Sequence, residues 1–203
     1  MYNPSLAQKK LSVEFGTGLP YNFTLPLTIR QSNFPDIKLT AKYSSEPFQI
    51  PIYWIWRIGY WSDNHAWELE SIHHKIFLDN KPREVEYFSI SHGINYVTIN
   101  HCWIFKYYIL RIGAGVVLDH PESKIRGKQF PEDGGIFKWG YYVGGPAINL
   151  TIAKRFYVRG NFYLDLEAKL NASYSNIPIQ DGSADVYNIV LQIDLLPGLD
   201  LNL

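Results

Sequence analysis

The sequence predicts an all-β protein, an antiparallel meander closed into a transmembrane β-barrel of eight or ten strands with a polar, charge-filled lumen. Apolar and polar residues alternate with the two-residue period of a strand along most of the 203-residue chain. Short polar turns alternate with mostly longer connections. Aromatic residues make up 16% of the chain and charged residues 19%, below the roughly 25% of an ordinary soluble domain. These features favour apolar surroundings.

Length and composition narrow the classes of protein. We expect residues 1–203 to form a single barrel domain, in which residues 1–35 either add strands or cover one rim. The 19 lysine and arginine residues balance the 19 aspartate and glutamate residues, so nucleic-acid binding is not expected. The single cysteine, Cys102, excludes an internal disulfide. No apolar run is long enough for a transmembrane helix, no cofactor is expected, and no signal peptide is visible at the start.

The first part of the chain predicts three strand segments of unequal quality. Residues 10–19 alternate cleanly. Residues 21–31 keep the period, but Pro26 cannot donate to a ladder and restricts this run to an edge, a loop or a short strand. Residues 36–45 alternate again, and we count this segment as one of the eight strands of the ring.

The stretch 50–78 predicts the central β-hairpin, with its turn at residues 62–65. One face carries Trp54, Trp56 and Trp67, while the other carries Arg57, Glu68 and Glu70. Strand character resumes in five later segments: 85–105, 107–118, 139–153, 162–174 and from 187 onward. The connections near 79–85, 119–137 and 176–186 are the longer ones.

Alternation alone fits two architectures. In a soluble calycin-like barrel that binds a small apolar ligand, the apolar face would point inward. In a membrane barrel, it would point outward and the lumen would be polar. The balanced charges on the polar face suit a lumen of paired ions. The residues that we expect to form these lumen ion pairs are Arg57, Glu68, Arg111, Glu167 and Lys169.

Two further patterns favour the membrane barrel. Short periplasmic turns opposite longer external loops are typical of outer-membrane barrels. Aromatic residues gather near the short turns, as in a girdle at a membrane interface. The girdle residues are Tyr60, Trp61, Trp67, Trp103, Phe105, Tyr108, Phe156, Tyr157 and Phe162.

With these features, the chain resembles the small outer-membrane β-barrel proteins of Gram-negative bacteria, a group that includes the OmpA and OmpW barrels and the lipid A deacylase PagL. The resemblance is architectural and covers most of the chain, without a family-specific motif. It implies a bacterial outer-membrane location, contact with membrane lipids and insertion by the outer-membrane assembly machinery. The last residue is Leu203, where this group usually ends on an aromatic residue.

The end with the long connections gathers the candidate functional residues. A hydrolase there would use Ser91 or Ser89 as nucleophile, His74 or His92 as base, and Glu70 or Glu122 as the orienting carboxylate. PagL resembles this in kind, but its His-x-Ser order differs from Ser91-His92, so no residue role is transferred. Candidate ligand-binding residues for lipid or lipopolysaccharide are His73, Lys75, Asn95, His120, Arg126 and Lys128.

No metal site is expected from the sequence. His73 and His74 are adjacent in a predicted strand and therefore point to opposite faces, so the pair cannot chelate one ion. The leading hypothesis is a structural or lipid-interacting outer-membrane barrel, and the alternative is a lipid A modifying hydrolase. Enzymatic activity, substrate and oligomeric state stay open at this point.

Overall fold

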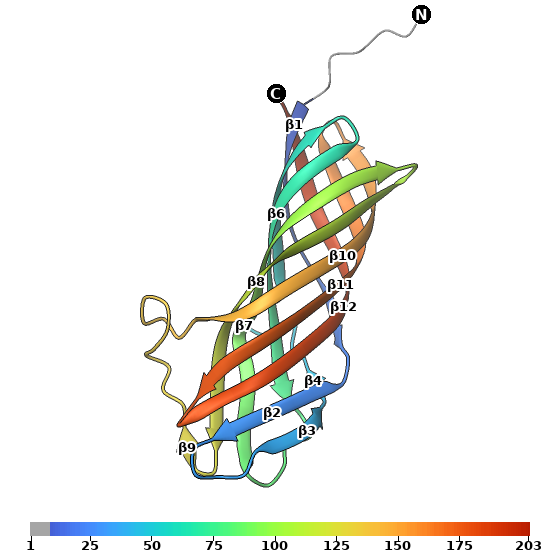
Figure 1. Cartoon of the computed structure of the whole chain (residues 1–203). Coiled ribbons are helices and arrows are strands. Elements are labelled where there is room, and N and C mark those ends of the chain that lie inside the picture. The colour runs from blue at the N-terminus through green and yellow to red at the C-terminus, as the bar shows by residue number, and fades with distance from the viewer. Residues whose placement is uncertain (1–8) are drawn as a thin grey trace, which may run out of the picture.

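The computed structural model describes residues 9–203 as one antiparallel sheet of twelve strands (Figure 1). The strands are β1 (Lys9–Asn22), β2 (Leu25–Gln31), β3 (Ile37–Ala41), β4 (Tyr43–Ser44), β5 (Trp54–Ser62), β6 (His65–Leu78), β7 (Val85–Phe105), β8 (Tyr108–Ile125), β9 (Lys128–Gln129), β10 (Tyr142–Arg159), β11 (Phe162–Ile179) and β12 (Gly182–Asn202). No helix in residues 9–203 is long enough and apolar enough to cross a membrane.

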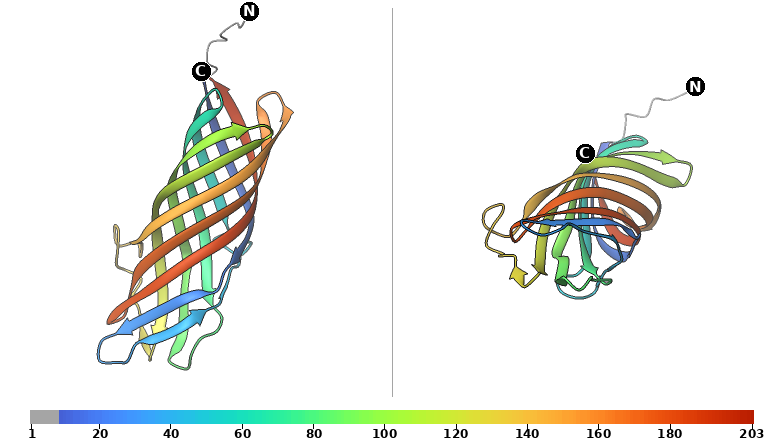
Figure 2. Two further views of the ribbon diagram at one scale, coloured as in Figure 1. Left: turned by 45° about the vertical axis from the view of Figure 1, so that its right-hand side comes forward. Right: turned by 60° about the horizontal axis from the view of Figure 1, so that its bottom comes forward.

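Eight strands close into a ring in the order β1, β5, β6, β7, β8, β10, β11, β12. Closure comes from β1 and β12, which pair from Lys10 opposite Asn202 to Asn22 opposite Val190. The strands tilt strongly around the barrel axis, and β1 begins at the same end at which β12 finishes (Figure 2). The predicted antiparallel meander of eight strands is therefore confirmed.

The membership of the ring differs from the prediction in one strand. The ring uses residues 9–22 as β1, whereas the predicted segment 36–45 is split into β3 and the two-residue β4. β2 pairs with the start of β12, β3 pairs with β2, and β4 pairs with the end of β6. The segment 36–45 is too short to span the barrel, so it extends the wall at one rim instead. Residues 1–8 lie outside the described residues.

The connections separate the two ends of the barrel. At the turn end, β5–β6, β7–β8 and β10–β11 are joined by two-residue turns. The opposite end, called the loop end here, carries the connections 79–84 and 130–141. The predicted long connection near 176–186 is wrong, because β11 and β12 continue to a tight turn at Gln180–Asp181. The predicted loop 119–137 is shorter as well, since β8 continues to Ile125.

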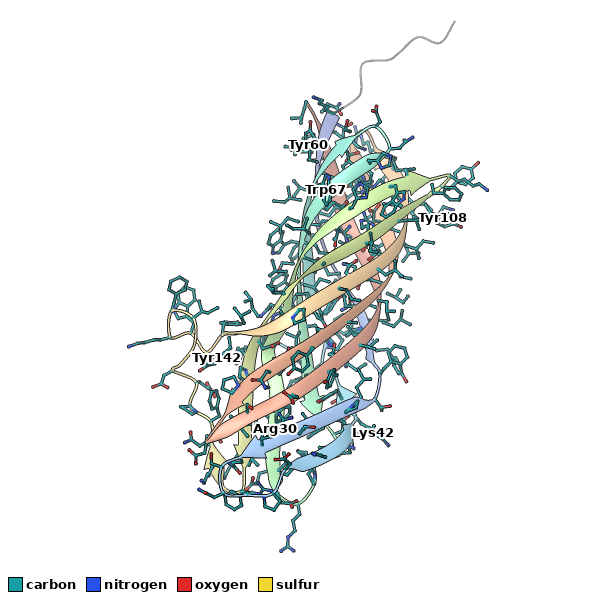
Figure 3. The ribbon with its side chains drawn as sticks, viewed as in Figure 1. Arg30, Lys42, Tyr60, Trp67, Tyr108 and Tyr142 are labelled. Carbon is teal, nitrogen blue, oxygen red and sulfur yellow. The ribbon has the colours of Figure 1, made fainter. Side chains whose placement is uncertain are left out.

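Apolar side chains cover the outside of the barrel in a band next to the turn end (Figure 3). On β12 this band runs from Leu199 to Ile189, which matches the roughly 9–11 residues that a tilted strand needs to cross a bilayer. Most of the predicted aromatic girdle is exposed at the turn end, including Tyr60, Trp67 and Tyr108. Trp103 is half-buried, whereas Trp61 points inward, is buried, and donates to Ser12 Oγ at 3.0 Å.

Within the band, the lumen is filled by buried ion pairs. Arg57 contacts Glu14, Glu70 and Glu167, and Arg111 contacts Glu68, Asp165 and Glu167. Lys169 Nζ lies 2.7 Å from Glu70. The five residues predicted as lumen ion pairs all lie in this network. Buried charges persist only when they are paired and hydrogen-bonded, so this network fixes which side of each strand faces inward.

Toward the loop end, the interior changes from ionic to apolar. A single buried cluster there includes Leu27, Ile29, Ile72, Ile90 and Val186. It also contains Ile37, Ala41 and Tyr43, the apolar face of the segment 36–45. The strands beyond the apolar band therefore enclose an ordinary hydrophobic core, with a polar exterior.

Replacing Arg111 by Met should destabilise the barrel by about 3–5 kcal/mol, because Glu68, Asp165 and Glu167 would lose a buried cation. Reversible denaturant unfolding in lipid vesicles, followed by heat-modifiable gel migration, measures this change. Arg159→Met at an exposed strand end is the matched control and should leave stability unchanged. Equal stability of both variants would mean that this face is solvated.

Candidate functional site on the outer wall

A bulge in β7 builds the candidate site. Ser91, His92 and Gly93 lie between Ile90 and Ile94, while the neighbouring strands carry one residue each at this level. Those residues are Lys75 on β6 and His120 on β8. Gly93 adopts a φ of 111°, a conformation that glycine tolerates best. Bulges redirect side chains, and this one places both Ser91 and His92 on the outer wall.

Glu122 of β8 is the centre of the resulting cluster. The Ser91 hydroxyl donates to Glu122 Oε1, and His92 Nδ1 lies 2.9 Å from the same oxygen. The Tyr87 hydroxyl donates to Glu122 Oε2 at 3.2 Å and accepts from Ser89 Oγ at 2.7 Å. Of the residues predicted for a hydrolase, the structure therefore brings together Ser91, His92 and Glu122, with Ser89 one contact away.

His120 completes the cluster beneath the loop 130–141. Its ring centroid lies 4.7 Å from that of His92 and 5.1 Å from that of Tyr141. The residue is only 7% exposed, because Gly140 packs so close that a Cβ there would collide with Nε2. Among the described residues, neither ring nitrogen of His120 has a hydrogen-bond partner. The Tyr141 hydroxyl donates to the His92 carbonyl at 3.1 Å and holds the loop in place.

The surroundings set the charge state of two members. Burial raises the pKa of Glu122, but hydrogen bonds from Ser91 and His92 outweigh this, and the net pKa is lowered. The pKa of His120 is also lowered, first by burial and then by the nearby His92. At neutral pH the cluster therefore holds an ionised carboxylate beside a neutral buried imidazole.

The cluster lies directly beyond the apolar band, at the level where lipid head groups would begin. Along β8, the outward residues are apolar up to Leu118 and become His120 and Glu122. The covering loop projects sideways from the wall (Figures 1 and 2). It exposes two large aromatic side chains, Phe137 and Trp139, which are 79% and 69% exposed and contact each other. Such a loop is suited to contact with a membrane surface.

Two residues predicted for catalysis lie elsewhere. His74 points into the barrel, where Nε2 lies 2.8 Å from Asn22 Oδ1. Glu70 accepts from Arg57 and Lys169 in the lumen. The structure does not bring either residue to the outer-wall cluster, because the alternation of β6 turns even-numbered residues inward.

The predicted ligand-binding residues divide between the cluster and the loop end. His73 borders the cluster, stacks on Trp54 at 5.5 Å and bonds to Asn95 at 2.8 Å. Lys75 Nζ donates to the Gln49 carbonyl at 3.0 Å. Arg126 and Lys128 are not brought to the cluster. They contact Pro35 and Asp181 at the loop end instead.

Sequence reasoning missed Tyr87, Gly140 and Tyr141. Tyr87 precedes Ser89 by two residues on the same strand, so the two-residue period of a strand places both side chains on one face. Gly140 and Tyr141 reach the cluster only through the fold of the loop, which no periodicity describes.

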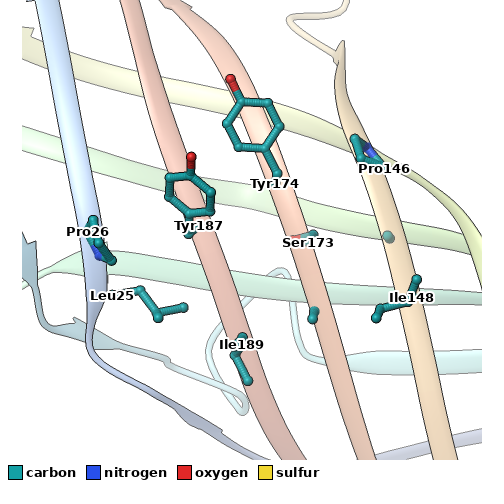
Figure 4. Close-up of a pocket in the computed structure, with 10 residues that line it drawn as sticks. Leu25, Pro26, Pro146, Ile148, Ser173, Tyr174, Tyr187 and Ile189 are labelled. Atoms are coloured by element: carbon teal, nitrogen blue, oxygen red, sulfur yellow. The ribbon is translucent and has the colours of Figure 1, made fainter.

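The outer wall also carries an apolar groove, made of two adjoining depressions. The depression nearer the loop end has a volume of about 380 Å³ and lies between Leu25, Pro26, Pro146, Tyr174 and Tyr187 (Figure 4). The depression nearer the turn end has a volume of about 570 Å³ and reaches across β10 to Trp67 and Ile99. Both depressions are lined by Ile148 and Ala172, so they form one continuous surface.

The His120 imidazole should titrate below its ordinary pKa of 6.5, because burial favours the neutral ring. Histidine-selective NMR, with the resonance assigned by comparison with His120→Gln, measures the midpoint. A midpoint at or above 6.5 would contradict the buried environment described for this residue.

No protein-family model and no curated protein matches the chain. Solved structures do match. Outer membrane protein AlkL in lipid bilayers is 12% identical with a TM-score of 0.50, and the match covers 100% of this chain and 95% of that one. Neisserial surface protein A is 10% identical with a TM-score of 0.43, covering 94% and 96%. Ail, the attachment invasion locus protein of Yersinia pestis, is 9% identical with a TM-score of 0.38, covering 93% and 98%.

The likeness to AlkL concerns the fold. It confirms the predicted resemblance to small outer-membrane β-barrel proteins and agrees with the apolar band around the barrel. The chain is a small outer-membrane-type β-barrel whose candidate site lies on its outer wall.

Proposed function

We propose that this protein binds a lipid of the outer leaflet against the outer wall of its barrel. The continuous apolar groove across β10 and β11 carries the proposal. Small side chains, among them Ala114, Ala147 and Ala172, leave room there between larger neighbours. The combined space is in the range of pockets that hold ligands of lipid-fragment size. An acyl chain that lies in the groove makes contacts that a smooth wall would not offer.

The interior favours a role for the wall over a role as a pore. Ion pairs fill the lumen within the apolar band, and an apolar core fills it toward the loop end. Eight-stranded barrels are narrow enough for side chains to occupy the interior. Within the apolar band, the outer wall is therefore the surface open to a ligand.

Polar groups lie at the end of the groove nearest the loop end. The rings of Tyr174 and Tyr187 lie 5.1 Å apart, and the Tyr174 hydroxyl donates to Asp185 at 2.9 Å. Arg30 pairs with Asp185 at 2.5 Å and keeps a side chain that is 47% exposed. Tyrosine hydroxyls suit the interface, and an exposed guanidinium suits a phosphate group. The groove thus offers an apolar channel for a chain and a polar end for a head group.

Filling the groove should release the lipid. Ala172→Trp occupies the surface that both depressions share, whereas Val13→Trp adds the same ring to the wall at β1, outside the groove. Native mass spectrometry after mild detergent extraction measures the lipid that each variant retains. We expect severalfold less lipid on Ala172→Trp than on the wild type or Val13→Trp. Equal retention by all three proteins would overturn the proposal, and the retained mass separates phospholipid from lipopolysaccharide.

A second candidate function is hydrolysis of an acyl ester at the cluster on β7 and β8. The convergence of Ser91, His92 and Glu122 at the head-group level favours it. Ser91 Oγ would attack the ester carbonyl, and His92 would take its proton and pass it to the departing alkoxide. The carboxylate lies between the hydroxyl and the imidazole, whereas the imidazole is central in a serine triad. His92 must therefore turn toward Ser91 before it can act as the base.

The hydrolase candidate predicts a mass change in lipid A. Expression of the wild type in a Gram-negative host should remove one acyl chain, and Ser91→Ala and His92→Ala should abolish the loss. His65→Ala, at the turn end, is the control that should retain activity. Identical lipid A from wild-type and empty-vector cells would exclude this activity.

A further inference from the structure

We propose that His92, His120 and Glu122 form a binding site for one divalent transition-metal ion, of which Zn²⁺ is the best-suited representative. The proposal goes beyond lipid binding and does not depend on it. Each residue offers one ligand atom, and the three atoms lie within 4.8 Å of one another. Two imidazoles and one carboxylate are the ligand set of many zinc sites that keep a further position open.

His120 supplies the observation that points most directly to a ligand. Its imidazole is buried and faces the cluster, and within the described structure both of its ring nitrogens lack a hydrogen-bond partner. A buried polar group without a partner is costly, which makes such groups rare in folded proteins. A metal ion bonded to one nitrogen would satisfy the side chain that the protein itself leaves unsatisfied.

The other two ligands are placed to complete the set. His92 Nδ1 and Glu122 Oε1 already lie 2.9 Å apart, a separation compatible with two atoms bound to one ion. The His92 side chain is 52% exposed, so it can rotate to adjust its distance to an ion.

Neighbouring residues support the ligands as outer-shell groups do in metal proteins. Ser91 and Tyr87 donate to Glu122 and fix its carboxylate. Tyr141 donates to the backbone of His92 and packs on the ring of His120. Gly140 leaves the space that the His120 ring occupies.

A contrasting set inside the barrel shows why this cluster is distinct. Glu14, Asp165 and Glu167 also approach one another closely. Arg57, Arg111 and Arg155 already neutralise them in the lumen. No arginine or lysine pairs with Glu122 within the described residues, and its partners are a histidine and hydroxyl groups. Of these two groups of described residues, the outer-wall cluster is the one whose ligand atoms no arginine neutralises.

Calorimetric titration of the chelator-treated, tag-free full chain with Zn²⁺, in detergent and without added lipid, tests the proposal. We expect one Zn²⁺ per chain with a Kd below about 1 µM. His120→Gln and Glu122→Gln should weaken binding by at least 100-fold. His65→Gln, a histidine at the turn end, should bind as the wild type does. Co²⁺ provides a second readout, since bound Co²⁺ should show visible absorption bands that His120→Gln lacks.

Heat-modifiable migration shows whether each variant is folded before titration. If a ligand variant does not fold, loss of the Co²⁺ bands in the fully folded His92→Ala protein provides the same evidence. Failure of the folded wild type to bind Zn²⁺ or Co²⁺ would overturn the proposal, and so would unchanged binding in His120→Gln. Because no lipid is present, either outcome is independent of the lipid-binding proposal.

Discussion

The carboxylate of Glu167, shared by Arg57 and Arg111 in the lumen, is the contact on which the rest of the structure depends. Both guanidinium groups lie 2.8 Å from Glu167 Oε1, and they come from β5 and β8, neither of which pairs with β11. Charges buried this deeply must be paired, so the polar face of every strand has to point inward. The apolar face then points outward, where only lipid makes it favourable. The same pairing fills the interior of the barrel within the apolar band.

Beyond the apolar band, the inward-facing residues become apolar and the outward-facing residues become polar, while the alternation continues. On β12, Ala184 and Val186 are buried inside, whereas Gln192 and Asp194 hold the equivalent inward positions within the band. Tyr96 marks the transition, because its ring lies in the apolar core and its hydroxyl donates to Asn188 at 2.7 Å. This exchange gives the loop end a polar exterior. The cluster around Glu122 therefore has water or head groups beside it instead of hydrocarbon.

Alternation was sufficient to predict the lumen and the lipid-facing wall, since both follow from the side on which a residue falls. It placed Arg57, Glu68 and Arg111 inside correctly. It fails where the period breaks: strict alternation places His92 inward with Ile90 and Ile94, and only the bulge turns it outward. His120 shows the second limit. Its burial depends on Gly140 and Tyr141, whose approach is set by a loop with no periodic pattern.

The order of groups in the cluster separates the two chemistries that it suggests. A serine nucleophile needs an imidazole against its hydroxyl, yet Ser91 and His92 both contact Glu122. A metal site needs the carboxylate beside the imidazoles, with hydroxyl donors behind it, and that is the arrangement around Glu122. The unsatisfied ring of His120 has a role in the metal site and none in the serine mechanism. An ion held by His92, His120 and Glu122 would supply Lewis-acid chemistry at this wall, whereas Ser91 would be the nucleophile of the hydrolase candidate.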